Sequence, residues 1–315
     1  MSNRNKLLLL AFISLLAIAL FLVWDVGTSW DYVLPKRTVK VIAIVLTGSC
    51  IAFATVIFQT ITNNRILTPS LIGLDSLYML IQTAIVFLFG GRQLALMEEE
   101  SHFLLSVGLM VAFALLLFRF VFRIEGRTIY FLLLIGIIFG TFFESITSFM
   151  QLLIDPNEFT LIQDAMFASF NRVNEELLII SFVLVGLVGV YSIRLFKYLD
   201  VLSLGRDHAI NLGVPYDSVV RQWLVVIAIL VSVSTALVGP ITFLGLLVAN
   251  LAHELMKTYR HTLLILSAIL ISIVTLLGGQ FLVEHVFTFT TTVSVLVNFV
   301  GGSYFLYLLL KGNQS

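Results

Sequence analysis

The residues of this sequence with the clearest capacity for chemistry are His253 and Glu254, which begin the zinc-binding pattern H-E-x-x-H. That pattern places a second histidine four residues after the first on one face of a helix, and the position is Lys257 here. One imidazole cannot supply the histidine pair that holds the zinc ion. The spacing therefore excludes this protease site, and no other cluster in the sequence predicts a catalytic or metal centre.

The absence of a second pattern excludes nucleotide hydrolysis of the P-loop type by this chain. The chain has no phosphate-binding loop of the form G-x-x-x-x-G-K-[ST], so any ATP that drives it must bind to another chain. Cys50 is the only cysteine, which excludes an intrachain disulfide and a multi-cysteine metal site. The formal net charge is zero and offers no basic field for nucleic acid. We expect no enzyme, no bound cofactor and no nucleic-acid partner.

The composition is that of a membrane protein. Hydrophobic residues make up 59% of the 315 residues and charged residues only 11%, against about 25% charged in soluble domains. A hydrocarbon core of about 30 Å needs about 20 apolar residues of helix, and such runs follow one another along the chain. They are too long and too uniform for barrel strands, so the prediction is an all-α polytopic protein with one transmembrane domain over residues 1–315. The predicted spans, about ten, are 7–23, 39–61, 71–89, 103–122, 128–151, 176–196, 222–239, 241–256, 262–282 and 293–310.

The first apolar run resembles a signal peptide, because Arg4 and Lys6 precede it. No small-x-small cleavage site follows the run, and we therefore expect it to be the first transmembrane helix.

The charges are distributed unequally between the two sides of these spans. With an even number of spans both termini lie on one side, and the excess of Lys and Arg there predicts that this side is the cytoplasm of a bacterial cell membrane. The other side holds most of the acidic residues, with Lys36, Arg37, Lys40 and Arg92 among its basic ones. The basic residues of the inner side are Arg4, Lys6, Arg65, Arg119, Arg123, Arg127, Arg194, Lys197, Arg206, Arg221, Lys257, Arg260 and Lys311.

Two connections are long enough to hold structure of their own. The outer one, 153–175, contains the short apolar piece 165–170, which we expect to form a surface or re-entrant helix. The inner one, 197–221, carries apolar residues at helical spacing, with Gly205 and Gly213 as breakers. It predicts two short helices at the membrane surface, with an ordinary loop as the alternative.

Few polar groups interrupt the apolar runs, and each has two interpretations. Glu144 either faces a water-filled vestibule or snorkels to the outer surface, while Asp75 near the inner start of its helix favours a structural role at the helix dipole. Gln59 and Asn298 either line a path or form hydrogen bonds between helices. A proton-driven transporter would bury more ionisable groups than these at mid-membrane.

Several motifs resemble those of a known family. They are the stretch 34–38, the segment 63–73 ending Leu67-Thr68-Pro69-Ser70-Leu71-Ile72-Gly73, the inner element 204–214 and the element 239–248, Gly-Pro-Ile-Thr-Phe-Leu-Gly-Leu-Leu-Val. In this order and spacing they resemble the permeases of ABC importers for iron chelates (siderophores) and cobalamin, over about residues 34–311.

The resemblance implies a bundle like that of the cobalamin importer permease, which transports a ferric siderophore by alternating access. It also implies a second permease subunit, identical or homologous, two ABC ATPase subunits and an extracytoplasmic siderophore-binding protein. Within a cytoplasmic coupling segment of about 198–220, the residues that it assigns to ATPase coupling are Leu204, Gly205, Arg206, Ala209, Leu212 and Gly213. Lys36 and Arg37 match the place where the family meets its binding protein. We add Gln59, Glu144 and Asn298 as residues of the translocation path.

The sequence also departs from the family pattern. Ala249, Asn250 and His253 stand where many members read P-H-x-x-R, and Glu284 with His285 lies where a basic residue is often found. The C-terminal part resembles the subgroup associated with catecholate or petrobactin-type siderophores. The alternative function is an ion-coupled secondary transporter that acts without an ATPase.

Overall fold

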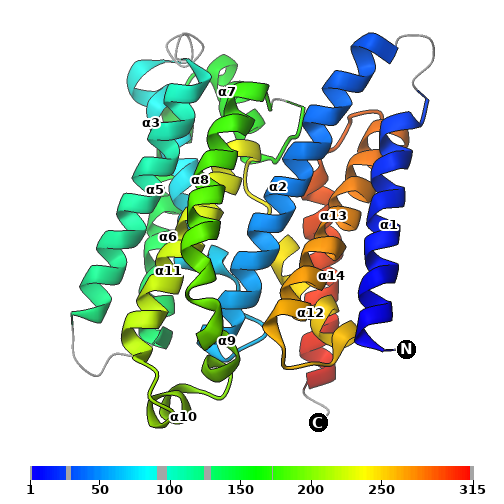
Figure 1. Ribbon diagram of the computed structural model, residues 1–315. Coiled ribbons are helices and arrows are strands. Elements are labelled where there is room, and N and C mark those ends of the chain that lie inside the picture. The colour runs from blue at the N-terminus through cyan, green and yellow to red at the C-terminus, as the bar shows by residue number, and fades with distance from the viewer. Residues whose placement is uncertain (1, 26–29, 91–97, 124–128, 172, 313–315) are drawn as a thin grey trace.

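The computed structural model describes residues 2–25, 30–90, 98–123, 129–171 and 173–312, and all the regular structure in these ranges is helical. The helices lie side by side in one bundle (Figure 1). They are α1 Asn3–Val23, α2 Trp30–Thr62, the 3-10 turn η1 Pro69–Ile72, α3 Leu74–Phe89, α5 Glu99–Phe122, α6 Ile129–Leu153, α7 Pro156–Met166, α8 Glu175–Ile193, α9 Phe196–Leu202, α10 Arg206–Asn211, α11 Tyr216–Val238, α12 Leu244–Met256, α13 His261–His285 and α14 Val293–Gly312.

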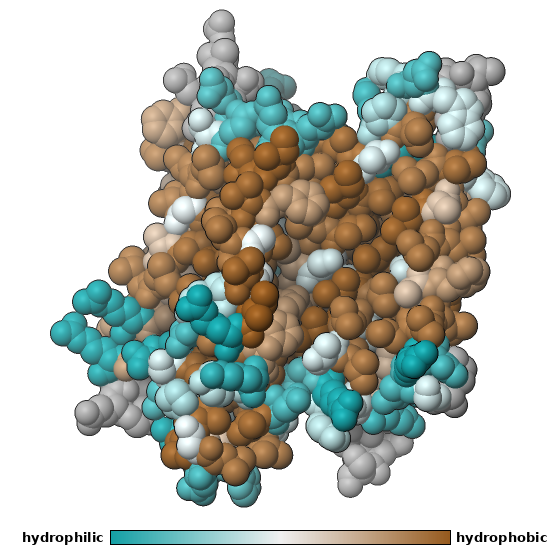
Figure 2. Space-filling model, viewed as in Figure 1, coloured by the Kyte–Doolittle hydropathy of each residue, from teal (hydrophilic) through white to brown (hydrophobic). Residues whose placement is uncertain are grey.

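The bundle has the dimensions and surface of a membrane domain. Seven of the described helices are long and apolar enough to span a bilayer, namely α1, α2, α5, α6, α8, α11 and α13, and three shorter apolar helices, α3, α12 and α14, accompany them. A broad apolar belt crosses the middle of the visible face, and polar residues lie above and below it (Figure 2). The predicted all-α polytopic bundle with about ten membrane helices is confirmed.

Both chain ends lie at the same end of the bundle, together with α9 and α10 (Figure 1). We call this end the inner end and the opposite end the outer end. The arrangement agrees with an even number of crossings. Arg92 and Arg127, which entered the charge analysis, lie outside the described residues.

The centre of the bundle is formed by α2 and α11, which are the most buried of the long helices. Trp223 of α11 is fully buried, and its ring packs against Phe53 of α2 and Phe196 of α9 at centroid distances of 6.1 and 6.0 Å. By contrast, α1 and α8 expose most of their side chains, as expected for helices that face lipid. The inner short helix α9 is therefore anchored on the core of the membrane domain.

Two helix starts differ from the prediction. Helix α2 begins at Trp30 instead of residue 39 and contains Pro35 in its second turn, where a proline costs only one hydrogen bond. In the outer connection the helix is α7, not the predicted 165–170. Asp155 caps it by accepting a hydrogen bond from the Asn157 amide at 2.8 Å, and Pro156 occupies its first position.

The residues after α7 enter the bundle without forming the expected helix. Ala168 and Phe170 are fully buried. The Ala168 amide donates to Ser294 Oγ at 3.1 Å, and the Ser169 amide donates to the Val238 carbonyl at 2.8 Å. The segment thus satisfies a backbone carbonyl at the end of α11, and the Ser294 side chain of α14 satisfies one of the segment's own buried amides, as buried backbone requires.

Glycines on α6 allow the turn η1 to pack directly against that helix. A methyl group added to Gly136 would lie 2.8 Å from the Leu71 carbonyl oxygen and 2.9 Å from the Ile72 Cα atom. Gly73 ends η1 with φ +86°, and a methyl group added to it would lie 3.1 Å from the Cα atom of Gly140. This close approach fixes the position of the helix that follows, α3.

We predict that Gly136→Ala lowers the stability of the protein by about 1–3 kcal/mol relative to Gly186→Ala, because only the first methyl group would overlap backbone atoms. Gly186 lies in α8 with open space around its Cα, and alanine there should be neutral or slightly stabilising. Thermal unfolding of the two purified variants in detergent measures the difference. Equal melting temperatures would contradict the close packing of η1 on α6.

Candidate functional site

Two helices begin inside the bundle instead of at its surface. Helix α3 follows the turn η1, and α12 follows the break at residues 239–243. With 16 and 13 residues, they are about 24 and 20 Å long, less than the hydrocarbon core of about 30 Å. Interrupted helices at mid-membrane are the places where transporters bind substrates and ions.

Asp75 lies at this depth, in the first turn of α3. Its Oδ1 accepts a hydrogen bond from Thr235 Oγ1 at 3.3 Å. Thr235 follows the inner start of α11, at Tyr216, by 19 residues, which is about 28 Å of helix. The prediction that Asp75 lies at the cytoplasmic surface is therefore wrong, because the turn η1 carries the chain inward before α3 begins.

An open chamber of about 390 Å³ lies beside Asp75. Glu144 of α6 and Thr242 of the α11–α12 break line it together with Asp75 and Ser76. Ser76 Oγ donates a hydrogen bond to Glu144 Oε1 at 3.0 Å. The side chain of Glu144 is exposed at the wall of this chamber.

Gln59 lies in a different place, at an inner cavity of about 550 Å³. Its Nε2 donates to the Arg65 carbonyl at 2.6 Å, and Asn250 Nδ2 donates to the same oxygen at 3.0 Å. Two buried amides thus hold the link that leads from α2 to η1. Gln59 therefore lines the inner cavity and also fixes the backbone of this link through its hydrogen bond.

Asn298 of α14 joins two helices. Its Oδ1 accepts a hydrogen bond from the Phe243 amide at 3.3 Å, which satisfies a free backbone donor at the start of α12. The three residues proposed for the path are therefore not brought together. Glu144 lines the chamber, Gln59 lines the inner cavity, and Asn298 contacts the start of α12.

A hydrogen-bonded row at the inner end connects α9 with α13 and α2. His261 Nδ1 lies 2.6 Å from Asp200 Oδ1, and its Nε2 lies 2.9 Å from Thr60 Oγ1. The His261 amide also donates to Asp200 Oδ1 at 3.1 Å. Partial burial acts to raise the pKa of Asp200, but the His261 hydrogen bonds and the charges of His261 and Arg260 outweigh it and hold that pKa below its usual value.

The predicted inner helices are present as α9 and α10, and they divide the proposed coupling residues into two groups. Ala209 is fully buried, whereas Leu204 and Leu212 are 54% and 64% exposed. The exposed pair, with Ile210, forms an apolar patch at the inner tip, which Figure 2 shows below the apolar belt. We call Leu204, Ile210 and Leu212 the inner patch.

Backbone conformation explains both glycines of this segment. Gly205 precedes α10 with φ +93°, and Gly213 follows it with φ +83°. Side chains rarely tolerate this region, so glycine is required there by the turns and not by close neighbours. Arg206, the first residue of α10, is exposed, and its guanidinium lies 3.7 Å from the Asp217 carboxylate.

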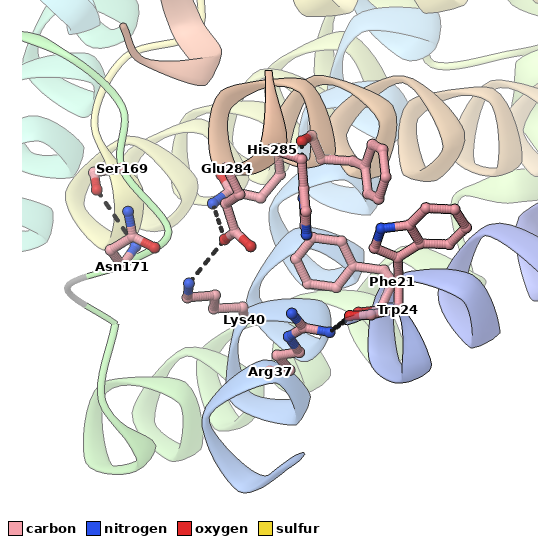
Figure 3. Close-up of polar contacts among 10 residues, drawn as sticks. Phe21, Trp24, Arg37, Lys40, Ser169, Asn171, Glu284 and His285 are labelled. Carbon is pink, nitrogen blue, oxygen red and sulfur yellow. Dashed lines mark hydrogen bonds and ion pairs between the residues drawn. The ribbon is translucent and has the colours of Figure 1, made fainter. Parts of the chain in front are cut away.

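The two outer basic residues, Lys36 and Arg37, have different surroundings, and Figure 3 shows those of Arg37. Arg37 donates hydrogen bonds to the carbonyls of Phe21 and Trp24, so it satisfies the last turn of α1. Lys36 is exposed, and among the residues that the structure describes its polar contact is with the side chain of Tyr32, within one helix. Of the two, Lys36 is available to a partner, while Arg37 also has a structural task.

Figure 3 also contains an ion pair that the sequence did not predict. Lys40 of α2 lies 2.8 Å from Glu284 of α13, and Gln280 Nε2 donates to the same carboxylate at 2.6 Å. The basic residue that the family pattern places near Glu284 is thus supplied by α2 as Lys40, and it is already paired. The sequence identified Glu284 only as a departure from the family pattern.

Within the described ranges no group of three or more His, Cys, Asp and Glu side chains is placed to hold a metal ion. Sequence reasoning missed Thr235, Asn250 and Asp200, because each acts through a partner far away in the chain. The only available signal was their polarity within or beside apolar segments.

The interrupted helices, the mid-depth chamber and the apolar belt define a multi-pass membrane transport protein. The chain belongs to the FecCD transport family, whose model matches residues 6–311. It is 62% identical over 315 residues to the petrobactin import system permease protein YclO of Bacillus subtilis, with 100% of both chains covered. It is 39% identical over 279 residues to the petrobactin import system permease protein FatC of Bacillus anthracis, covering 89% of this chain and 79% of the relative.

The same fold is found in a solved structure of a metal-chelate type ABC transporter in an inward-facing conformation. The TM-score is 0.84 at 23% identity, and the match covers 98% of this chain and 100% of the other. At this identity the likeness establishes the fold alone.

We predict that Asp200→Asn lowers stability at neutral pH, with a difference from the wild type that narrows as the solution is acidified. A carboxylate whose pKa is lowered by folding stabilises the protein above its usual pKa, and this contribution disappears as the pH falls through the lowered value. Thermal unfolding of the purified protein as a function of pH measures it. Asp207→Asn, at an exposed position of α10, is the control, and equal pH profiles for the two variants would contradict the Asp200–His261 interaction.

Proposed function

We propose that this chain is the permease subunit of an ABC importer for ferric siderophores, with petrobactin-type chelates as its substrates. The observation that carries the proposal is the full-length 62% identity to a petrobactin permease, together with the family match over residues 6–311. The chain performs no covalent chemistry. It switches access to a central path between the two sides of the membrane.

We further propose that two ABC ATPase subunits bind at the inner end. The inner patch supports this, because apolar side chains exposed beyond the membrane belt are typical of surfaces that contact another protein. Helix α9 adds a mechanical reason. Its links to Trp223 and, through Asp200, to His261 would pass a movement of the segment to α11 and α13.

The remaining partners of the proposal are a second permease, identical or homologous, and an extracytoplasmic siderophore-binding protein. A second subunit is supported by Glu144, which is exposed on a membrane helix where contact with lipid would be costly. With both termini in the cytoplasm of a bacterial cell, the binding protein would approach the outer end, where Lys36 is free to meet its carboxylates.

An ion-coupled secondary transporter is the second candidate. The position of Asp75 at mid-membrane supports this candidate, because ion-coupled carriers place carboxylates at that depth. The sequence alone had placed Asp75 near the inner surface. The two candidates differ in their energy source, which an experiment with sealed vesicles can identify.

We predict that vesicles containing this chain, a second permease, the ATPase and the binding protein take up radiolabelled ferric petrobactin only with ATP inside, and that ionophores have no effect. Leu212→Glu should reduce uptake at least tenfold and release the ATPase during purification, because a charge would enter an apolar contact. Tyr259→Glu, 73% exposed on a neighbouring inner loop, is the control. Uptake that needs no ATP and stops with an ionophore would favour the secondary transporter.

We predict that Lys36→Glu weakens capture of the loaded binding protein several-fold at low salt, with a smaller effect at high salt, because exposed charges are screened. Binding-protein affinity for the transporter in nanodiscs measures this. Lys197→Glu at the inner end is the control. Reversal of Arg37 is a poor test, because it would also remove the hydrogen bonds to α1. An unchanged affinity at low salt would exclude Lys36 from the docking surface.

A further inference from the structure

Four arginines gather at the inner end of the bundle, where α5 and α8 end and α11 begins. They are Arg119 and Arg123 of α5, Arg194 of α8 and Arg221 in the second turn of α11, and all four are exposed. Figure 1 shows these helix ends side by side at the lower left, and in Figure 2 polar residues lie along the same edge, below the apolar belt. We call these four residues the arginine cluster.

Contacts with aromatic rings join the cluster across the three helices. The guanidinium of Arg221 lies 5.9 Å from the ring centre of Phe122, which the two α5 arginines flank in the chain. Gln222, the next residue of α11, accepts a hydrogen bond from the hydroxyl group of Tyr191 at 2.8 Å. The guanidinium of Arg194 lies 5.1 Å from the ring centre of Tyr191. The positive charges of three helices are therefore held at one place.

The chain itself does not neutralise these charges. Among the described residues, no arginine of the cluster forms an ion pair with a carboxylate. Asp217, one turn before Arg221, lies 3.7 Å from Arg206 instead, and only its backbone carbonyl accepts a hydrogen bond from Arg221 Nε, at 3.1 Å. Neighbouring like charges repel one another, so the cluster would be stabilised by an anion that the chain does not supply.

The helix dipole explains only part of this arrangement. Arg123 and Arg194 directly follow the last residues of α5 and α8, where the negative end of a helix favours a cation. Arg221 lies near the start of α11, which is the positive end, and the dipole gives no stabilisation to a cation there. Helix ends therefore do not account for Arg221, whereas an external anion does.

Exposed apolar residues precede the arginines on the same helix faces. On α5, Leu116 lies one turn before Arg119, and on α8, Val190 lies one turn before Arg194. Leu187, a further turn along α8, is also exposed. Each helix thus presents an apolar strip that ends in a guanidinium group, which matches the order of acyl chain and phosphate in a phospholipid.

We propose that the arginine cluster binds the head group of an anionic phospholipid in the leaflet at the inner end, with guanidinium groups donating hydrogen bonds to the phosphate oxygens. Guanidinium suits this role because its parallel N–H groups can bind a phosphate group through two hydrogen bonds. Anionic lipids are favoured over zwitterionic ones, because the ammonium group of a zwitterionic head group would be repelled by the remaining arginines. The inference does not depend on which substrate the protein transports.

A soluble anion and a partner protein are the competing ligands. A soluble phosphate would use the arginines but not the exposed apolar strips beside them. An acidic surface on a soluble partner could meet the arginines, but it would not reach Leu116 and Val190 within the apolar belt. A phospholipid uses both features at once, and the observations therefore favour it.

The test uses the full chain purified in detergent and titrated with phosphatidylglycerol or with phosphatidylcholine of identical acyl chains. Native mass spectrometry measures the affinity for each lipid, and thermal unfolding is followed in parallel, because a ligand of the folded state raises the melting temperature. The variants are Arg119→Gln/Arg221→Gln and, on a separate helix, Arg194→Gln. Arg4→Gln/Lys257→Gln is the matched control, since it removes the same charge as the double variant from other exposed positions at the inner end. Glycerophosphoglycerol, the head group without acyl chains, is added as a competitor.

We expect the wild type to bind phosphatidylglycerol at least tenfold more tightly than phosphatidylcholine, since each basic residue near an anionic membrane surface contributes about fivefold. The double variant should retain a preference of threefold or less, Arg194→Gln should be intermediate, and the control should match the wild type.

Equal affinity of the wild type for the two lipids, or an equal loss in the control, would overturn the inference. So would displacement of the bound lipid by an equimolar amount of glycerophosphoglycerol, because the acyl chains would then contribute nothing. A double variant that binds both lipids as the wild type does, but no longer retains the ATPase, would assign the arginines to a protein partner instead.

Discussion

The membrane interior offers the backbone no hydrogen bonds, and this constraint governs how the chain can interrupt its helices. The breaks before α3 and α12 place free amides and carbonyls at mid-depth. They are tolerated because neighbouring groups satisfy them, as Asn298 does for the Phe243 amide. After α7, the Ser169 amide likewise donates to the Val238 carbonyl at the end of α11. Interrupted helices at the centre of the bundle therefore depend on side chains, such as that of Asn298, that form hydrogen bonds with the exposed backbone groups.

Close backbone packing then converts these breaks into a chamber. Gly73 against Gly140, and Gly136 against the turn η1, bring the start of α3 to the middle of α6. Ser76 and Glu144 meet only because two elements more than 60 residues apart approach without side chains between them. Contact of a carboxylate with lipid is costly at this depth, and Asp75 and Glu144 line the same chamber.

Packing and hydrogen bonds connect the inner end to the central helices. Helix α9 packs its first residue, Phe196, on Trp223, and Asp200 connects the helix to His261 and, through that ring, to Thr60. The polar row joins α9, α13 and α2, while the inner patch remains uncovered in this single chain. A force applied to the patch would reach the two most buried helices through few intermediate contacts.

Apolar run length, the sidedness of Lys and Arg, and the glycine-bounded inner segment were sufficient to predict the helical class, about ten membrane helices and the pair α9 and α10, because these depend on local solvent preference. The depth of Asp75 and the bonds of Asn298 and Arg37 could not be predicted in this way. They depend on contacts between residues far apart in the chain, which local composition does not encode. Sequence thus determined which segments enter the membrane, whereas tertiary packing decided which polar residues meet inside it. The physical reason is that a turn such as η1 changes the depth at which the next helix begins without changing the hydropathy of the segment.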